Sequence, residues 1–476
     1  MTMARWTAIG SVLLLSMPGH AEGLADRLDA IVRSYHDAGL FQGAVLVASG
    51  GEVIYRGAFG LANAEWRVPN TTETRFAIAS LGKAFTAAMV LQLVDEGRIA
   101  LEDPIAAHLP SYRRDLGSRI TIHHLLSHTA GIRGVPQDWI DHDYRKAYTL
   151  DQLVALANES DLEFEPGTKF QYCNSCYNLL GATIEAVTGR AYADELRRRI
   201  LEPLGMADTG LVDHRVVLEQ RASGYDRLAD GTLANADLQD QSFAVGAGGM
   251  YSTIDDLYRW DRGLAGDGFL SPKSRAAMFT RGLGGSGYGW GIGSYATHGG
   301  EQGTMALGFG GTKGFASVLA RFLDHDHLVV ILGNVRQIPQ NALGNDLWNS
   351  VLGFKVRPLS DLYNLAMSEG AEAAAHAYRA RQNRGGEDGL PKEADINRAG
   401  YLFLSLGRTA DAIAVLALNV ALHPESANAH DSLGEAYAAH GAATRAIASY
   451  DKALALNPEM ASAKAALTRL REATSD

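Results

Sequence analysis

A serine and a lysine three residues apart, Ser80 and Lys83, form the pair in this sequence best suited to nucleophilic chemistry. On a helix these two side chains lie on one face, with Cβ atoms about 5–6 Å apart. A serine hydroxyl is a weak nucleophile, and a lysine that burial keeps neutral can act as its base. A helix N-terminus at Ser80 would also present free N–H groups to developing negative charge. Because a helix cap beside a solvated lysine has the same spacing, the surrounding sequence has to decide.

Several further segments occur in a fixed order around this pair. They read FAIASLGKAFTA at 76–87, IHHLLSHTAGI at 122–132, PGTKFQYCN at 166–174, GGMYST at 248–253 and GGTKGF at 310–315. With these segments the chain resembles the serine β-lactamase and penicillin-binding protein superfamily. It is most similar to the class C-like branch, which also holds esterases and D-amino-acid peptidases. The resemblance extends over roughly residues 24 to 355.

The resemblance implies a site built on an acyl-enzyme at Ser80, with Lys83 as its activating partner. It places Tyr172 beside both, where the phenol can relay a proton to the leaving group. It also implies that Asn174 hydrogen-bonds Lys83 and the substrate, and that the amides of Ser80 and Gly311 form the oxyanion hole. Ser127 and His128 are expected to shape the site rather than to react. No metal or cofactor is implied.

The third motif of the family departs from its usual form. Lys-Thr-Gly or His-x-Gly is expected on a late strand, but the corresponding residues here are Gly308, Phe309 and Gly310, which carry no cation. His298, followed by two glycines, is the alternative, and Lys313 is a second source of charge nearby. A site without a cation binds an anionic substrate poorly, because the anion loses water without gaining a partner. Esters need no such anchor, so we expect ester hydrolysis to exceed cephalosporin hydrolysis.

The two cysteines of the chain, Cys173 and Cys176, lie three residues apart within the segment that carries Tyr172. They either bridge each other or stay free. A thiol nucleophile is the less favoured reading, since Ser80 already fills that role. A zinc site is not expected, because no second cysteine pair stands at ligand spacing.

The apolar periodicity predicts an α+β fold for the first domain, with an antiparallel sheet flanked by helices and, by resemblance, a helical subdomain. Expected elements are a helix near 24–35, a hairpin over 44–55, a helix over 80–97, a hairpin over 315–332 and a helix over 345–352. We assign residues 1–21 to a signal peptide, 22–356 to the hydrolase domain, 357–395 to a helix and linker, and 396–476 to tetratricopeptide-like repeats.

The repeat assignment depends on a period of 34 residues. Gly400 matches Gly434, and four further identities recur at the same spacing: Gly407 with Gly441, Ala412 with Ala446, Ile413 with Ile447, and Pro424 with Pro458. This period is typical of tetratricopeptide repeats, an all-α array that buries its faces by stacking. The segment around Gly370 is a candidate for a degenerate third unit. Such repeats could bind a protein partner or cover the active site.

Composition narrows the function further. The chain has 476 residues, 46% hydrophobic and 20% charged, with a formal net charge of −11. An acidic chain without a basic stripe argues against a nucleic-acid partner. The charged and then apolar N-terminal segment predicts export to the periplasm or the medium. We therefore expect a serine hydrolase acting on carboxylic esters or related amides. The alternatives are a β-lactamase or D-amino-acid peptidase, and a catalytically weak binding protein that uses its repeats.

Overall fold

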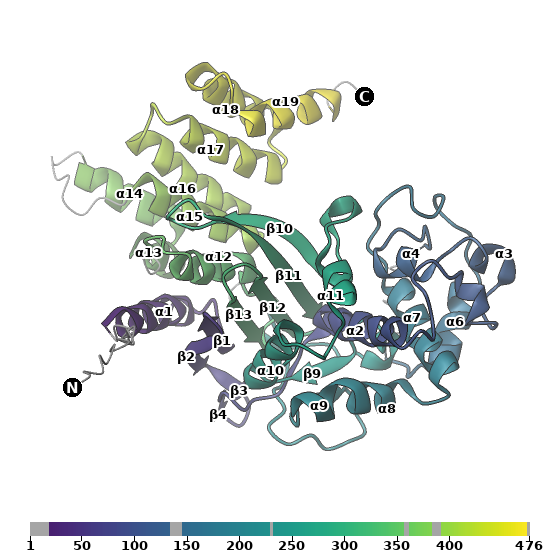
Figure 1. Cartoon of the computed structure of the whole chain (residues 1–476). Helices are drawn as coiled ribbons and strands as arrows, with labels where there is room; N and C mark the ends of the chain where they lie inside the picture. Colours follow the sequence, from purple (N-terminus) through teal and green to yellow (C-terminus); the bar gives the residue numbers. More distant parts are fainter. Residues whose placement is uncertain (1–18, 134–144, 229–231, 357–360, 383–391, 474–476) are drawn as a thin grey trace, which may run out of the picture.

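The computed structural model describes residues 19–133, 145–228, 232–356, 361–382 and 392–473 (Figure 1). Residues 1–18, which hold most of the predicted signal peptide, lie outside this part of the chain. Among the described helices, none is long and apolar enough to cross a membrane.

The centre of the molecule is a six-stranded antiparallel sheet with the order β10-β11-β12-β13-β1-β2. The N-terminal hairpin pairs with the last strand, so that Gly43 lies opposite Gly333 although 290 positions separate them. The strands are β1 (Gly43–Ser49), β2 (Glu52–Phe59), β10 (Gly291–Ala296), β11 (Gln302–Thr312), β12 (Phe315–Phe322) and β13 (His327–Gly333).

The central strands β1, β12 and β13 are apolar on both faces because helices cover both. In β1, Ala44 and Leu46 belong to one core, whereas Val45 and Val47 belong to the other, as the two-residue period of a strand requires. On the first face lie α2 (Gly82–Asp95), α10 (Ile254–Ala265) and α11 (Pro272–Phe279). On the second lie α1 (Gly19–Asp37) and α12 (Gln340–Val351).

A helical subdomain packs on the far side of α2 (Figure 1). Helix α2 is therefore buried almost all round, from Gly82 to Leu91, which suits its position between two layers. The subdomain contains α3 (Arg114–Gly117), α4 (Ile122–Leu126), α6 (Leu150–Ala157) and α7 (Asn174–Thr188). Helices α8 (Tyr192–Leu196) and α9 (Glu202–Leu204) follow, joined by a π-helical turn.

Short strands and turns connect these layers. Three of the strands, β5 (Phe76–Ala77), β9 (Met250–Ser252) and β6 (Gly210–Leu211), form a small sheet that leads into the segment around Ser80. The others form two-stranded ribbons: β3 (Leu61–Asn63) with β4 (Val68–Pro69), and β7 (Tyr225–Arg227) with β8 (Leu233–Asn235). The predicted α+β class with its antiparallel sheet is confirmed.

The described residues after Val356 are mainly helical, as predicted, whereas most of the predicted linker, 383–391, lies outside the described part of the chain. Gly400 lies against Leu416, and Gly434 lies against Tyr450, so the same close helix contact recurs after 34 residues. The described helices are α13 (Asp361–Glu369), α14 (Ala371–Gln382), α15 (Glu393–Ser405), α16 (Thr409–Leu422), α17 (Ala427–Ala439), α18 (Ala443–Leu456) and α19 (Ala461–Ala473). Their identity as tetratricopeptide repeats stays a prediction.

The helical array does not stand apart from the sheet, because α13–α17 share one hydrophobic core with α1, α12 and the second face of the sheet. Polar groups join the two parts as well. The buried carboxylate of Asp346 accepts a hydrogen bond from Tyr35 Oη at 2.7 Å and pairs with Arg398 of α15 at 3.0 Å. Within this shared core, the helices α15–α17 pack most extensively on one another and on α14 and α18. Only α18 and α19 form a core separate from it.

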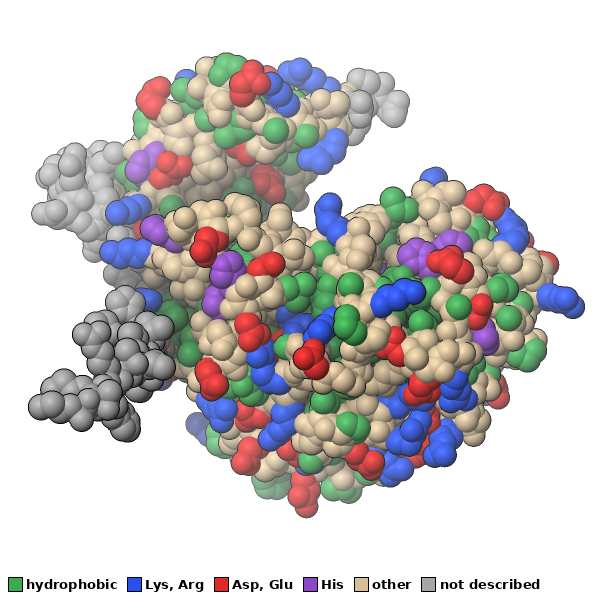
Figure 2. All heavy atoms as spheres, viewed as in Figure 1, with side chains coloured by type: hydrophobic (Ala, Val, Ile, Leu, Met, Phe, Trp, Pro, Cys, Tyr) green, Lys and Arg blue, Asp and Glu red, His purple; other side chains and the backbone are tan. Residues whose placement is uncertain are grey.

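On the face shown in Figure 2, Lys and Arg side chains are interspersed with Asp and Glu over both the body and the helical array. The interspersed charges do not form a continuous basic stripe on this face, in keeping with the acidic composition.

Candidate active site

The nucleophile candidate is presented by a turn that glycines make possible. Ser80 lies in a 3-10 turn, Ala79–Leu81, that leads directly into α2. Ala79 has a positive φ of 46°, a conformation that costs free energy in a residue other than glycine and that clusters at functional sites. Gly248 packs so closely on this turn that a Cβ there would lie 2.4 Å from Ala79 O. Glycine at position 248 is therefore needed to let the turn form.

Three of the predicted residues meet at the Ser80 hydroxyl. Lys83 Nζ lies 3.1 Å from Ser80 Oγ, and Tyr172 Oη donates a hydrogen bond to the same oxygen at 2.8 Å. Lys83 Nζ also donates to the carbonyl of Ala247 at 2.7 Å. The predicted spacing of i and i+3 on a helix face thus becomes a direct contact. The Ala247 carbonyl, which follows from no sequence pattern, holds the amine in place.

The environment of Lys83 favours a neutral amine. Its side chain is 2% exposed and lies 4.7 Å from the ring centre of Tyr172, with no carboxylate paired to it among the described residues. Burial lowers the pKa of Lys83 to about 7. An amine with this pKa is partly unprotonated near neutral pH and can then accept a proton, which is what a base for Ser80 must do.

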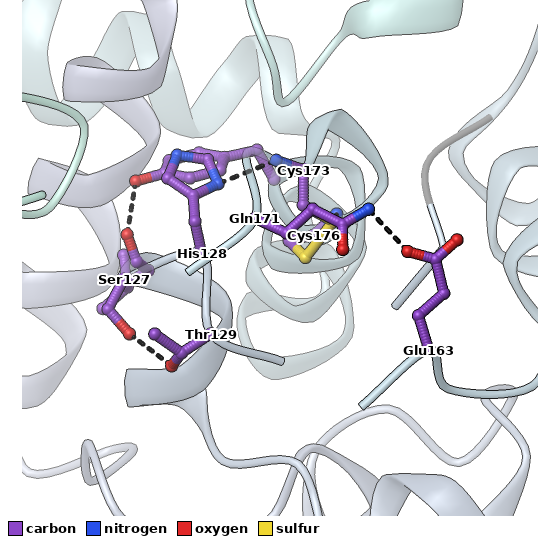
Figure 3. The surroundings of a disulfide bond; sticks show 9 residues. Ser127, His128, Thr129, Glu163, Gln171, Cys173 and Cys176 are labelled. Carbon is purple, nitrogen blue, oxygen red and sulfur yellow. Dashed lines mark hydrogen bonds between the residues drawn. A yellow bond between two sulfur atoms is a disulfide. The ribbon is translucent and has the colours of Figure 1, made fainter. Parts of the chain in front are cut away.

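Tyr172 is held by the segment that precedes α7. Its ring lies 4.7 Å from the ring of His128, and His128 Nδ1 accepts the backbone N–H of Cys173 at 3.0 Å (Figure 3). Burial lowers the pKa of His128 to about 3, so this imidazole is a neutral support. Burial of the phenol also raises the pKa of Tyr172, partly offset by its hydrogen bond to Ser80, so the phenol carries its proton.

Cys173 and Cys176 form a disulfide, with 5.3 Å between their Cα atoms. Both residues are buried, and Cys173 Sγ caps α7 by accepting the N–H of Cys176. The cross-link therefore sits at the start of α7, directly after Tyr172. A bonded sulfur is not a nucleophile, which leaves Ser80 without a rival in this segment.

The altered third motif is the part of β11 that lies next to Ser80. A Cβ on Gly310 would lie 2.2 Å from Ile78 O, and one on Gly308 would lie 2.7 Å from the Leu81 side chain. Glycine at both positions therefore lets the nucleophile turn lie directly on the strand.

The edge of β11 near Ser80 is open. Pairing with β10 ends at Leu307, whereas pairing with β12 continues to Thr312. Leu323 N donates to Thr304 O, so even-numbered residues of β11 direct their peptide groups toward β12. Gly311, two positions beyond Phe309, therefore directs its N–H to the open edge. This is the edge where the predicted oxyanion-hole amide is required, and its role stays a prediction.

Other predicted residues lie elsewhere. Asn174 is the first residue of α7, but the described hydrogen bonds of Lys83 go to Ser80 and Ala247, so the expected bond from Asn174 is not formed. His298 N donates to Leu352 O and its ring packs on Phe354, beyond the end of α12. His298 is thus not the third-motif residue, because the β10–β11 turn carries it away from Ser80.

Lys313 follows β11 in the turn to β12, and its ammonium lies 3.6 Å from Asp237. It lines a small cavity of about 130 Å³ that does not include Ser80. Its position next to the third motif in sequence therefore does not bring its charge to the nucleophile.

Ser80 opens into a cavity of about 520 Å³ between the helical subdomain and β10–β11. Its wall is mainly aromatic and aliphatic. The described lining residues that have apolar or aromatic side chains are Phe170, Tyr172, Trp290, Ile292, Met305, Leu307 and Phe309. Arg281 also lines it. Sequence analysis identified neither Trp290 nor Arg281 as a site residue, because single residues in loops carry no periodic or motif signal. Phe170 lies within the PGTKFQYCN segment, but the segment alone did not show that its ring lines the cavity.

Comparison with known proteins fits this geometry. Residues 28–352 match the Beta-lactamase family. The chain belongs to the Beta-lactamase family. It is 30% identical to Penicillin-binding protein 4* of Bacillus subtilis, over 62% of this chain and 68% of that protein. It is 32% identical to Esterase EstB of Burkholderia gladioli, over 57% of this chain and 79% of the relative.

Among solved structures, the D-stereospecific amidohydrolase of a Streptomyces species is similar with a TM-score of 0.57. Its sequence identity is 25%, over 69% of this chain and 98% of the other. Members of the family that this chain resembles thus carry names of three kinds: penicillin-binding protein, esterase and amidohydrolase. The family is settled by these matches, whereas the substrate has to be argued from the cavity.

Proposed function

We propose that this protein hydrolyses carboxylic esters through an acyl-enzyme on Ser80. The observation that carries the proposal is the position of Ser80 Oγ, within 3.1 Å of a buried amine and 2.8 Å of a phenol. A neutral Lys83 accepts the Ser80 proton as Oγ attacks the carbonyl carbon. The oxyanion then lies near the amides of Ser80 and Gly311, as the family resemblance implies.

The intermediate collapses when the bond to the leaving alkoxide breaks, and Tyr172 Oη supplies its proton. Lys83, protonated in the first step, returns that proton to the phenolate. Water then attacks the acyl-enzyme with Lys83 again as base, which releases the acid and restores Ser80. The protons balance within each half of the cycle: in the first half the Ser80 proton leaves with the alcohol by way of Lys83 and Tyr172, and in the second half Lys83 passes the proton of the attacking water to Ser80 Oγ.

Two features favour esters over β-lactams or peptides. The third-motif positions on β11 offer glycine and an apolar ring in place of the strand-borne cation that would hold a β-lactam carboxylate, and the arginine of this cavity, Arg281, is held against β10 instead. An alkoxide or phenolate also leaves with less protonation than an amine requires. We therefore expect kcat/KM for p-nitrophenyl butyrate to exceed that for a chromogenic cephalosporin.

The test compares native protein with Ser80→Ala and Ser286→Ala. Ser286 lines the same cavity but donates its hydroxyl to Gly287 O, so it is a matched serine without an amine or phenol beside it. Ser80→Ala should lose covalent labelling by a fluorophosphonate, read as intact mass, and lower ester turnover by several powers of ten. Ser286→Ala should keep both. Full ester turnover in Ser80→Ala, or faster turnover of the cephalosporin by native protein, would refute the proposal.

A further inference from the structure

The charges that face the Ser80 cavity are all basic. Its described lining contains Lys83, His128 and Arg281, and no aspartate or glutamate among them. Because burial keeps His128 neutral and leaves Lys83 only partly charged near pH 7, the lasting positive charge of this lining is Arg281. An apolar cavity with one such charge disfavours cations and offers a partner to an anion.

Arg281 is held in place by backbone. It follows α11, and its Nε donates to the carbonyl of Ile292 on β10 at 3.1 Å. Its loop continues through Gly284, which has a φ of 64° and packs against the Phe170 ring. The guanidinium is therefore tethered to β10, and the loop that follows it packs against the helical subdomain. Its two Nη atoms make no ion pair with any described carboxylate.

Two other cationic side chains, Lys313 and Arg336, lie close to β11 but do not line the Ser80 cavity. Lys313 lies near Asp237 and lines a separate cavity. Arg336 covers Gly311, since a Cβ there would lie 2.9 Å from its Cζ, but Arg336 is not among the residues that line the Ser80 cavity. Lys313 and Arg336 therefore serve as control residues for Arg281.

We propose that Arg281 binds an anionic group of the substrate, so that the preferred esters carry a carboxylate separated from the reacting carbonyl by an apolar spacer. The spacer contacts the apolar side chains between Ser80 and β10, chiefly Ile292, Met305 and Leu307. The guanidinium pairs with the carboxylate by charge-assisted hydrogen bonds. The inference rests on the proposed ester hydrolysis and names the substrate class that this site selects.

The anionic group can belong to the acyl part or to the alcohol part of the ester, and two probe pairs distinguish them. On the acyl side, mono-p-nitrophenyl glutarate is compared with p-nitrophenyl pentanoate. On the alcohol side, 4-acetoxybenzoate is compared with its methyl ester. For each pair, the ratio of kcat/KM for the anionic probe to that for the neutral probe is measured in native protein and variants.

Arg281→Gln should lower this ratio roughly tenfold for at least one pair, mainly through KM, and Arg281→Lys should restore part of it. Turnover of the neutral probes should stay within about twofold. Arg275→Gln is the matched control, because Arg275 lies on α11 but pairs with Asp267 outside the cavity. Lys313→Gln and Arg336→Gln should also leave the ratio unchanged.

An unchanged ratio in Arg281→Gln for both pairs would overturn the inference, as would a loss that follows Lys313 or Arg336 instead. In either case continued hydrolysis of the neutral esters would leave the proposed function standing. Absence of ester turnover in native protein would instead refute the proposed function itself.

Discussion

Replacing Lys83 by methionine should abolish catalysis and at the same time stabilise the fold in a pH-dependent way. In the folded protein the ammonium loses its water, which lowers its pKa from 10.5 to about 7. At about 1.36 kcal/mol for each pKa unit, keeping Lys83 charged in the fold costs about 5 kcal/mol. Methionine has a similar length and carries no charge, so Lys83→Met removes this cost.

The direction in which the stability difference changes with pH follows from proton binding by Lys83. Below pH 7, Lys83 carries its proton in both the folded and the unfolded chain, and the full cost is present. Between pH 7 and 10.5 the unfolded chain binds more protons than the folded one, so the free energy of unfolding of the native protein rises with pH. The advantage of Lys83→Met therefore shrinks as the pH rises.

The loss of a hydrogen bond offsets part of this gain in stability. Methionine leaves the Ala247 carbonyl without its donor, which costs about 2 kcal/mol. We expect Lys83→Met to raise the free energy of unfolding by about 3 kcal/mol at pH 6 and by about zero at pH 9. Urea unfolding followed by tryptophan fluorescence at pH 6, 7.5 and 9 measures this, and ester turnover is recorded on the same samples.

Two variants serve as controls. Ser80→Ala is inactive but keeps Lys83, so its unfolding should follow the native pH dependence. Lys452→Met changes an exposed lysine of α18 and should show no pH-dependent gain. A stability difference between Lys83→Met and native protein that stays constant from pH 6 to pH 9 would show that Lys83 is not destabilised by burial.

Two further expectations concern stability. A chain ending at Val356 should melt roughly 10 °C or more below the full chain, as measured by circular dichroism. The reason is that the truncation exposes the α1–α12 surface and removes Arg398 from Asp346. An unchanged melting temperature would mean that the shared core contributes little to stability. Cys173→Ser should retain ester turnover within about threefold, since the serine hydroxyl can still cap α7. The loss of the short disulfide loop should lower the free energy of unfolding by about 2 kcal/mol. An activity loss as large as that of Ser80→Ala would show that the disulfide itself positions Tyr172.

The sequence alone determined the parts of this protein that depend on local periodicity and on ordered motifs. The two hairpins, the helix after Ser80 and the repeated 34-residue spacing are each specified by neighbouring residues. The contact of Ser80 with Lys83 follows from helix geometry, and that of Tyr172 from the family segment that contains it.

Tertiary structure decided everything that joins distant segments. The carbonyl of Ala247 lies against Lys83, 164 positions away in the chain, because the glycines beside it permit close packing. A backbone acceptor of this kind cannot be recognised from residue types in the sequence. Arg281 enters the cavity through a loop whose path depends on β10 and Phe170. Likewise the helical array is joined to α12 through a buried carboxylate, Asp346, whose partner lies 52 residues later. In each case the determining interaction is between groups far apart in the chain, so only the folded arrangement could reveal it.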